Sequence, residues 1–173
     1  MHADADHPWR QCYRDLAAKL LLFARQWVAC QNDAEDVVQQ AFVRFWKKHG
    51  SADRAHYPLL FAAVRTISLD HLRGESRRVR RENDPDAPIT REDTPCFDLA
   101  PDDLERAELT VAVSAALRAL PADQREVVVL KVWGELTFQE IADTLGAPLN
   151  TVTARYRYAL QKLRDRIHQY ERA

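Results

Sequence analysis

The chain has 173 residues, of which 46% are hydrophobic and 29% are charged, and its formal net charge is −1. This length allows one ordinary domain or two small ones, and the apolar content excludes a chain that is disordered throughout. Three scattered cysteines exclude a disulfide scaffold, and the absence of an apolar run of ~18 residues or a signal-peptide pattern predicts a cytoplasmic protein with no membrane insertion.

Charge is distributed unevenly along the chain. Residues 65–82 carry six arginines against three acids, and residues 150–173 carry six basic side chains against two acids. Residues 83–108, between them, carry nine acids against two arginines. Two basic segments separated by an acidic one are typical of a protein that binds a polyanion through local positive faces. The alternative is that arginine-rich helix ends are simply solvated.

Apolar residues recur at helical spacing almost everywhere, and no stretch shows the alternation of a strand. In the first half this periodicity predicts a helix over residues 12–29, a second from Asn32 or Asp33 to Gly50, and a third from about Pro58 into the basic run 73–81. The expected buried stripe of the second helix is Val38, Ala41, Phe42 and Phe45. Cys12 and Cys30 share the apolar pattern, so both are expected in the core.

The segment 83–103 contains four prolines among many acids and shows little periodicity, which predicts a linker. Helices are expected after it over residues 104–120 and 122–133. We therefore predict an all-α chain with two small helical domains, residues 8–82 and 104–170, joined by an acidic, proline-rich linker.

Residues 137–163 have the spacing of a helix-turn-helix. Thr137 and Glu140 fit a capping box at the start of the first helix, Gly146 suits a left-handed stop, and Asn150 is expected to cap the second helix. The buried stripe of that second helix is expected to be Val152, Tyr156, Ala159, Leu160, Leu163 and Ile167.

The second helix of this hairpin fits a DNA major groove, which is about 12 Å wide and admits one helix. The side chains off its buried stripe mix phosphate partners with short groups that permit close approach to bases: Thr151, Thr153, Ala154, Arg155, Arg157, Tyr158 and Lys162. The alternative is an ordinary helical hairpin with an arginine-rich solvent face.

Two further segments carry candidate binding residues. In the third helix, Arg65, His71, Arg73, Arg77 and Arg78 are spaced to follow a phosphate backbone, with Tyr57 and Phe61 upstream to stack on unpaired bases. For Phe61 the alternative is core packing. The second helix has a largely polar face beside its apolar stripe, which suits either solvent or a docking partner. This face consists of Asp36, Gln39, Gln40, Val43 and Arg44.

The segment DAEDVVQQAFVRFWKK (33–48) resembles the core-polymerase-binding helix of bacterial sigma-70 family factors. The segment from LPADQREVVV to LQKLRDRI (120–167) is similar to their C-terminal promoter-binding domain. Chain length and the short acidic linker resemble the extracytoplasmic-function group. The resemblance spans roughly residues 10–82 and 104–168.

This resemblance implies residue roles and an all-helical fold of two sigma domains. Core polymerase would be bound by Asp33, Asp36, Gln39, Gln40 and Arg44. The minus-ten element would be melted and held by Phe61, Arg65, Thr66, Asp70, His71, Arg73, Arg77 and Arg78. The minus-thirty-five element would be read by Thr137, Asn150, Thr151, Thr153, Ala154, Arg155, Arg157 and Tyr158. The linker would run toward the RNA exit channel, and the resemblance also implies an anti-sigma factor as a partner.

Three positions depart from the family's usual pattern. Gln39-Gln40 stands where Gln-Glu is usual, Thr66 stands where Asn is common, and Thr153 stands where Lys or Arg is frequent. Because Thr153 carries no charge, base readout would fall more to Thr151, Arg157 and Tyr158.

The predicted function is that of a sigma factor, which binds core RNA polymerase and directs promoter-specific initiation. The alternative is an autonomous dimeric helix-turn-helix regulator, which has no need of residues 33–46 in this form. No HExxH, P-loop or GxSxG motif occurs, so we expect no catalysis, metal or cofactor in this chain.

Overall fold

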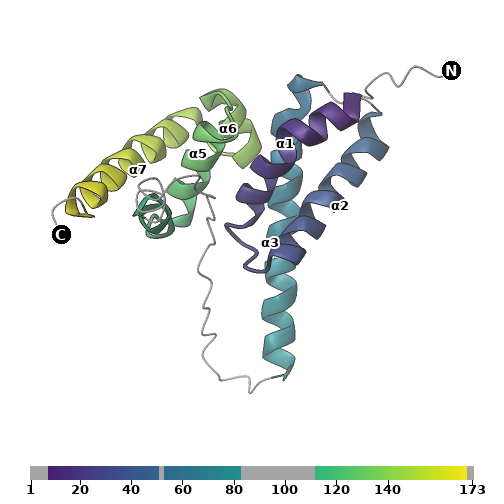
Figure 1. Cartoon of the computed structure of the whole chain (residues 1–173), viewed down its shortest axis with the longest axis horizontal. Coiled ribbons are helices and arrows are strands. Elements are labelled where there is room, and N and C mark those ends of the chain that lie inside the picture. The colour runs from purple at the N-terminus through teal and green to yellow at the C-terminus, as the bar shows by residue number, and fades with distance from the viewer. Residues whose placement is uncertain (1–7, 51–52, 83–111, 171–173) are drawn as a thin grey trace, which may run out of the picture. The chain divides into compact units, whose positions relative to one another are not determined.

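The computed structural model describes residues 8–50, 53–82 and 112–170. Within these ranges all regular secondary structure is helical, which confirms the predicted all-α fold. The chain divides into two compact units, residues 1–94 and 95–173, each with its own core (Figure 1). The predicted linker 83–103 and the start of the helix expected at 104 lie outside the described residues. Among the helices of the described ranges, none combines the length and the apolar character needed to span a bilayer.

The described residues of the first unit form helices α1 (Pro8–Ala24), α2 (Gln31–His49) and α3 (Tyr57–Glu82), with the 3-10 turn η1 (Arg54–His56) before α3. The three α-helices pack against one another (Figure 1). Each helix turns one apolar stripe inward, because burying such a stripe is what makes short helices stable. The fully buried large side chains of the first unit are Leu16, Leu20, Phe23, Val37, Leu60, Phe61 and Val64.

Helix α2 has well-defined ends. It begins one residue before the predicted Asn32, with Asp33 in its first turn, and its last turn is basic; both charges suit the helix dipole. Gly50 stops it in the left-handed conformation (φ 64°), where glycine carries no steric penalty, and its N–H donates to Trp46 O. Phe42 and Phe45 are buried, as predicted.

The two described cysteines differ in environment. Cys12 lies in the core, as predicted, and burial raises the pKa of its thiol to about 11, with the charge of Asp15 adding to the effect. The prediction for Cys30 was wrong. Cys30 is exposed, because the chain is extended there and the residue forms the N-cap of α2 rather than part of a helix.

Brief alkylation of the native protein at mildly alkaline pH should therefore label Cys30 and spare Cys12. Only the thiolate reacts, and the raised pKa keeps the Cys12 thiol protonated while burial blocks access. Peptide mass spectrometry measures the two rates separately, and Cys30→Ser serves as the control in which Cys12 stays protected. Equal labelling rates for the two cysteines would contradict the packing of α1.

The second unit contains a helical segment at residues 112–118, followed by α5 (Ala122–Val132), α6 (Phe138–Leu145) and α7 (Leu149–Tyr170). Helices α5, α6 and α7 all contact one another. Pro121 occupies the N-cap of α5. The core includes Leu117, Val127, Val129, Leu130, Ile141, Val152 and Ala159.

The predicted hairpin is present over α6 and α7. Thr137 Oγ1 accepts from the Glu140 N–H at 3.2 Å, and the Thr137 N–H donates to Glu140 Oε2 at 2.6 Å, which confirms the capping box. Gly146 ends α6 with a φ of 62°, as predicted. These two features fix where α6 begins and where the chain turns toward α7.

Two expectations for α7 were wrong. Asn150 is not its cap, because the helix begins at Leu149 and the first-turn amides of Thr151 and Val152 already donate to Pro148 O. Of the predicted buried stripe, Val152 and Ala159 are buried, whereas Leu160, at its edge, is 42% exposed. Tyr156, Leu163 and Ile167 are half-buried.

Candidate functional site

A polar groove of about 370 Å³ lies between α2 and α3. Asp33, Asp36, Gln40 and Arg44 line it from α2, because residues three and four apart share one helix face. From α3 come Ile67, Asp70 and His71, and His71 Nε2 lies 3.9 Å from Asp33 Oδ2. The groove therefore joins residues predicted to bind a protein with residues predicted to bind DNA.

Gln39 is separated from this groove. It lines a smaller hollow of about 180 Å³ on the side of α2 that faces α1, together with Glu35 and Tyr13. One residue corresponds to about 100° of rotation around a helix, so neighbouring Gln39 and Gln40 point to different sides. The five residues predicted to dock a partner thus divide between two sides of α2.

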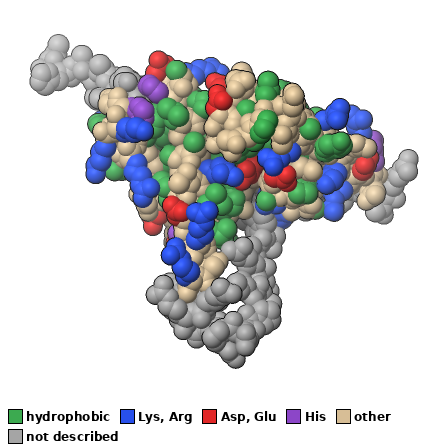
Figure 2. All heavy atoms as spheres, turned by 180° about the vertical axis from the view of Figure 1, so that it is seen from behind, with side chains coloured by type: hydrophobic (Ala, Val, Ile, Leu, Met, Phe, Trp, Pro, Cys, Tyr) green, Lys and Arg blue, Asp and Glu red, His purple; other side chains and the backbone are tan. Residues whose placement is uncertain are grey.

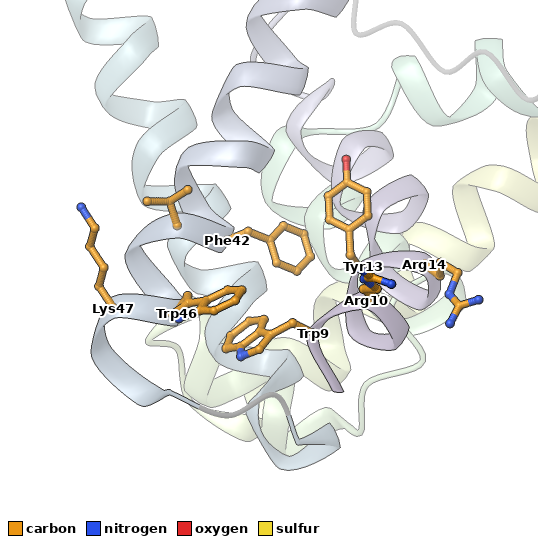
Figure 3. Close-up of a pocket in the computed structure, with 8 residues that line it drawn as sticks. Trp9, Arg10, Tyr13, Arg14, Phe42, Trp46 and Lys47 are labelled. Atoms are coloured by element: carbon orange, nitrogen blue, oxygen red, sulfur yellow. The ribbon is translucent and has the colours of Figure 1, made fainter. Parts of the chain in front are cut away.

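An apolar groove of about 800 Å³ runs between α1 and α2 (Figure 3). Trp9 stacks on Trp46 with centroids 5.3 Å apart, and Tyr13 meets Phe42 at 5.0 Å. Val43 and Trp46 are 53% and 52% exposed. The rim is basic and consists of Arg10, Arg14 and Lys47.

The aromatic part of this groove was missed in the sequence. The signal was present, because Trp46 falls off the stripe Val38–Phe42–Phe45, and an exposed tryptophan on an amphipathic helix is typical of an interaction surface. What the sequence lacked was the position of Trp9, which only the packing of α1 against α2 supplies.

Several polar side chains on the outer face of α3 already have partners within the helix. Arg73 Nη1 lies 3.1 Å from Asp70 Oδ1, and Arg77 Nε donates to Arg73 O at 3.1 Å. The hydroxyl of Thr66 donates to Ala62 O at 2.9 Å, so its proton is used within the helix. On the face seen in Figure 2, basic side chains of the described residues are interspersed with acidic ones. The side chain of Arg78 lies outside the described residues.

Phe61 does not belong to this face, and its predicted role in base stacking was wrong. Its side chain is 0% exposed and meets the Phe23 ring edge-on, with centroids 5.5 Å apart. It follows Leu60 and precedes Val64 by three residues, so it lies on the inward side of α3. The alternative, core packing, is the observed one.

At the start of α7 the predicted DNA-facing residues are partly exposed. Arg157 and Tyr158 are exposed, with Arg157 Cζ 5.3 Å from the Tyr158 ring centroid. Thr151, Thr153 and Ala154 are half-buried, and the Thr153 hydroxyl donates to Asn150 O at 3.0 Å.

Two other residues of the set have partners within the second unit. Arg155 Nε lies 3.0 Å from Asp123 Oδ2 of α5, a pairing that the sequence did not reveal. Thr137 Oγ1 also lies 2.8 Å from Glu140 Oε2, so its hydroxyl supports the start of α6.

The described residues contain no group of three or more His, Cys, Asp or Glu side chains placed to hold a metal ion. They do contain a helix-turn-helix whose second helix exposes basic and aromatic side chains. The first unit also carries the apolar groove between α1 and α2. These features define a helical nucleic-acid-binding protein that also carries a surface for a protein partner.

Comparison with known proteins gives the same picture. The family models "Sigma-70 region 2" and "Sigma-70, region 4" match residues 12–78 and 110–163. The RNA polymerase sigma-E factor of Streptomyces avermitilis is 31% identical over 155 residues, which cover 86% of this chain and 78% of that protein. The ECF RNA polymerase sigma factor SigE of Mycolicibacterium smegmatis is 30% identical over 159 residues, covering 91% of this chain and 60% of that protein.

A solved structure shares the fold. The sigma factor RpoE of Bartonella quintana, determined in complex with the anti-sigma factor NepR, superimposes with a TM-score of 0.70 at 23% identity, covering 92% of this chain and 95% of that one. The chain belongs to the sigma-70 family of RNA polymerase sigma factors, in the extracytoplasmic-function group.

Proposed function

We propose that the chain is a dissociable promoter-specificity subunit, which binds core RNA polymerase through its first unit and promoter DNA through both. The observation that carries this proposal is the exposed side of α2, which adjoins a polar groove toward α3 and an apolar groove toward α1. An autonomous dimeric helix-turn-helix regulator needs a surface for its second copy, but it has no need of residues 33–46 in this form. The proposal places the chain in the cytoplasm and assigns it no reaction of its own.

The docking surface in this proposal extends beyond the polar residues. Asp36, Gln40 and Arg44 supply charge and hydrogen bonds, which set orientation and association rate. Val43 and Trp46 supply the exposed apolar area that stable protein interfaces bury at their centre. A tryptophan stacked on a second tryptophan is rigid before binding, so it loses little side-chain entropy on docking.

The DNA contacts in this proposal fall to two helices. Arg65, Arg73 and Arg77 of α3 follow the backbone of the minus-ten strand, where each neutralised phosphate releases counterions. The α6–α7 hairpin reads the minus-thirty-five duplex through α7. The crystallised relative was bound to an anti-sigma factor, and we propose that a partner of that kind restrains this chain too.

Asp36→Arg should weaken binding of the full chain to core polymerase by roughly tenfold, because it reverses a charge in the lining of the polar groove. The side chain is exposed and off the buried stripe, so folding should be unaffected. Fluorescence anisotropy of the labelled chain, titrated with core polymerase, measures the affinity.

Glu35→Arg is the matched control for this experiment. It makes the same change of charge on the same helix, at an exposed residue whose carboxylate accepts from Gln31 Nε2 at 3.0 Å. It lines neither the polar groove toward α3 nor the apolar groove toward α1, so binding should stay near normal. Normal polymerase binding by Asp36→Arg would remove the α2–α3 groove from the interface.

A further inference from the structure

Arg155 of α7 is held by a carboxylate from another helix. Its Nε lies 3.0 Å from Asp123 Oδ2, and the two side chains are 31% and 48% exposed. The other oxygen, Asp123 Oδ1, accepts the N–H of Gln124 at 3.0 Å. The bond to Gln124 holds the carboxylate within the first turn of α5 and leaves Oδ2 for Arg155, so the acid offers Arg155 a fixed partner.

The contact uses only part of the guanidinium. An arginine has five N–H donors in a rigid planar fork, and here Nε carries the ion pair. In the described part of the chain Arg155 has no second partner. The two terminal Nη groups are thus available to an incoming acceptor, with the plane of the fork already oriented by Asp123.

An acid at this place is costly for a surface that binds DNA, since a carboxylate near phosphates repels them. The Asp123 carboxylate does not contribute to the attraction between the protein and DNA, so its presence calls for another role. One is stabilisation of the α5 N-terminus, where carboxylates suit the helix dipole. The other is control of the position of Arg155.

We propose that Asp123 is a positioning residue, which holds the Arg155 guanidinium so that its Nη groups meet a phosphate of the upstream promoter duplex. The inference rests on the proposed function, in which α7 enters that duplex. A preoriented arginine loses less side-chain freedom on binding, so the gain appears only when Arg155 is present. That dependence separates positioning from both electrostatic repulsion and helix stability.

The test is a double-mutant cycle of Asp123→Asn and Arg155→Ala in the full chain, assembled with core polymerase. Affinity is measured on a fluorescent duplex that carries the upstream promoter element, and thermal unfolding of every variant is recorded. With Arg155 present, Asp123→Asn should weaken binding by about threefold, a size typical of partly exposed ion pairs. With Arg155→Ala, the same change should strengthen binding, because only the repulsion is removed.

This reversal of sign is specific to positioning. If Asp123 only supports the fold, Asp123→Asn should weaken binding in both backgrounds, and if it only repels DNA, the substitution should strengthen binding in both. Either result would overturn the inference, and so would a lack of any effect of Asp123→Asn when Arg155 is present. Asp143→Asn is the matched control: that exposed acid of α6 contacts Gln139 Nε2 at 3.1 Å, and its effect should have one sign in both backgrounds.

Arg157→Ala, measured in parallel, separates failure of the positioning role from failure of the proposed function. If it changes DNA binding while the Asp123–Arg155 cycle is additive, the positioning role falls and the proposed function stands. If neither Arg155→Ala nor Arg157→Ala changes binding, the hairpin is not a DNA reader and both fall.

Discussion

Phe61→Ala is expected to lower the free energy of unfolding of the first unit by about 3–5 kcal/mol, the usual cost of removing a buried phenyl ring. The ring is fully buried and packs edge-on against Phe23, so its loss leaves a cavity where α1 meets α3. Small domains are stable by only about 5–15 kcal/mol, so the variant should be partly unfolded at growth temperature. Urea denaturation followed by tryptophan fluorescence measures the loss.

Two variants test whether this loss comes from burial. Phe61→Leu keeps most of the apolar volume and should cost about 1.5 kcal/mol or less. Tyr158→Ala removes an aromatic ring that is 51% exposed, so its effect on stability should be small. A Phe61→Ala protein of normal stability that fails only in promoter melting would restore the base-stacking role that the structure has removed.

The sequence predicted the elements of this fold well because their signals are local. The capping box of Thr137 and Glu140 and the stop at Gly146 each depend on a few neighbouring residues, and both were found where expected. Apolar periodicity likewise identified the inward face of α2. It failed at Cys30, because an apolar pattern does not show that the helix has already ended at Ala24.

What the sequence could not supply is which faces meet. Asp33 and His71, or Asp123 and Arg155, are far apart in the chain, and each pair forms only because two helices pack at one particular angle and register. The sequence of each helix predicts a polar face but does not indicate which residue of the neighbouring helix will contact it.

Arg125 illustrates the same limit with a backbone partner. It is only 8% exposed, and its Nη1 donates to Arg118 O at 3.1 Å and to Leu120 O at 3.3 Å, so it satisfies carbonyls at the end of the preceding helical segment. Burial lowers the pKa of the guanidinium, while the charge of Glu126 opposes that shift. Apolar periodicity does not predict that this arginine is buried, because every residue has a backbone carbonyl and the sequence does not show which ones need a side-chain donor.

Arg157→Ala should change which upstream promoter element the holoenzyme prefers, whereas Arg155→Ala should weaken binding to all elements nearly alike. Arg157 is exposed beside Tyr158 in the first half of α7, and Thr153, a half-buried residue whose hydroxyl donates to Asn150 O, supplies no charge there. An arginine that reads a guanine edge contributes about 1–3 kcal/mol of discrimination. Removing a phosphate-binding group, as Arg155→Ala does, instead lowers the slope of log affinity against log salt by about 1.

The measurement is holoenzyme affinity for a panel of duplexes that differ only in the upstream element, at two salt concentrations. Both variants should bind core polymerase normally, because the proposed docking surface lies on α2 in the other unit. The two arginines are two residues apart on α7, so their side chains leave the helix about 200° apart and meet different parts of the duplex. Identical losses for both across the whole panel, with the same fall in salt slope, would mean that Arg157 also holds a phosphate. Sequence preference would then rest on Thr151 and Tyr158, or on the shape of the duplex itself.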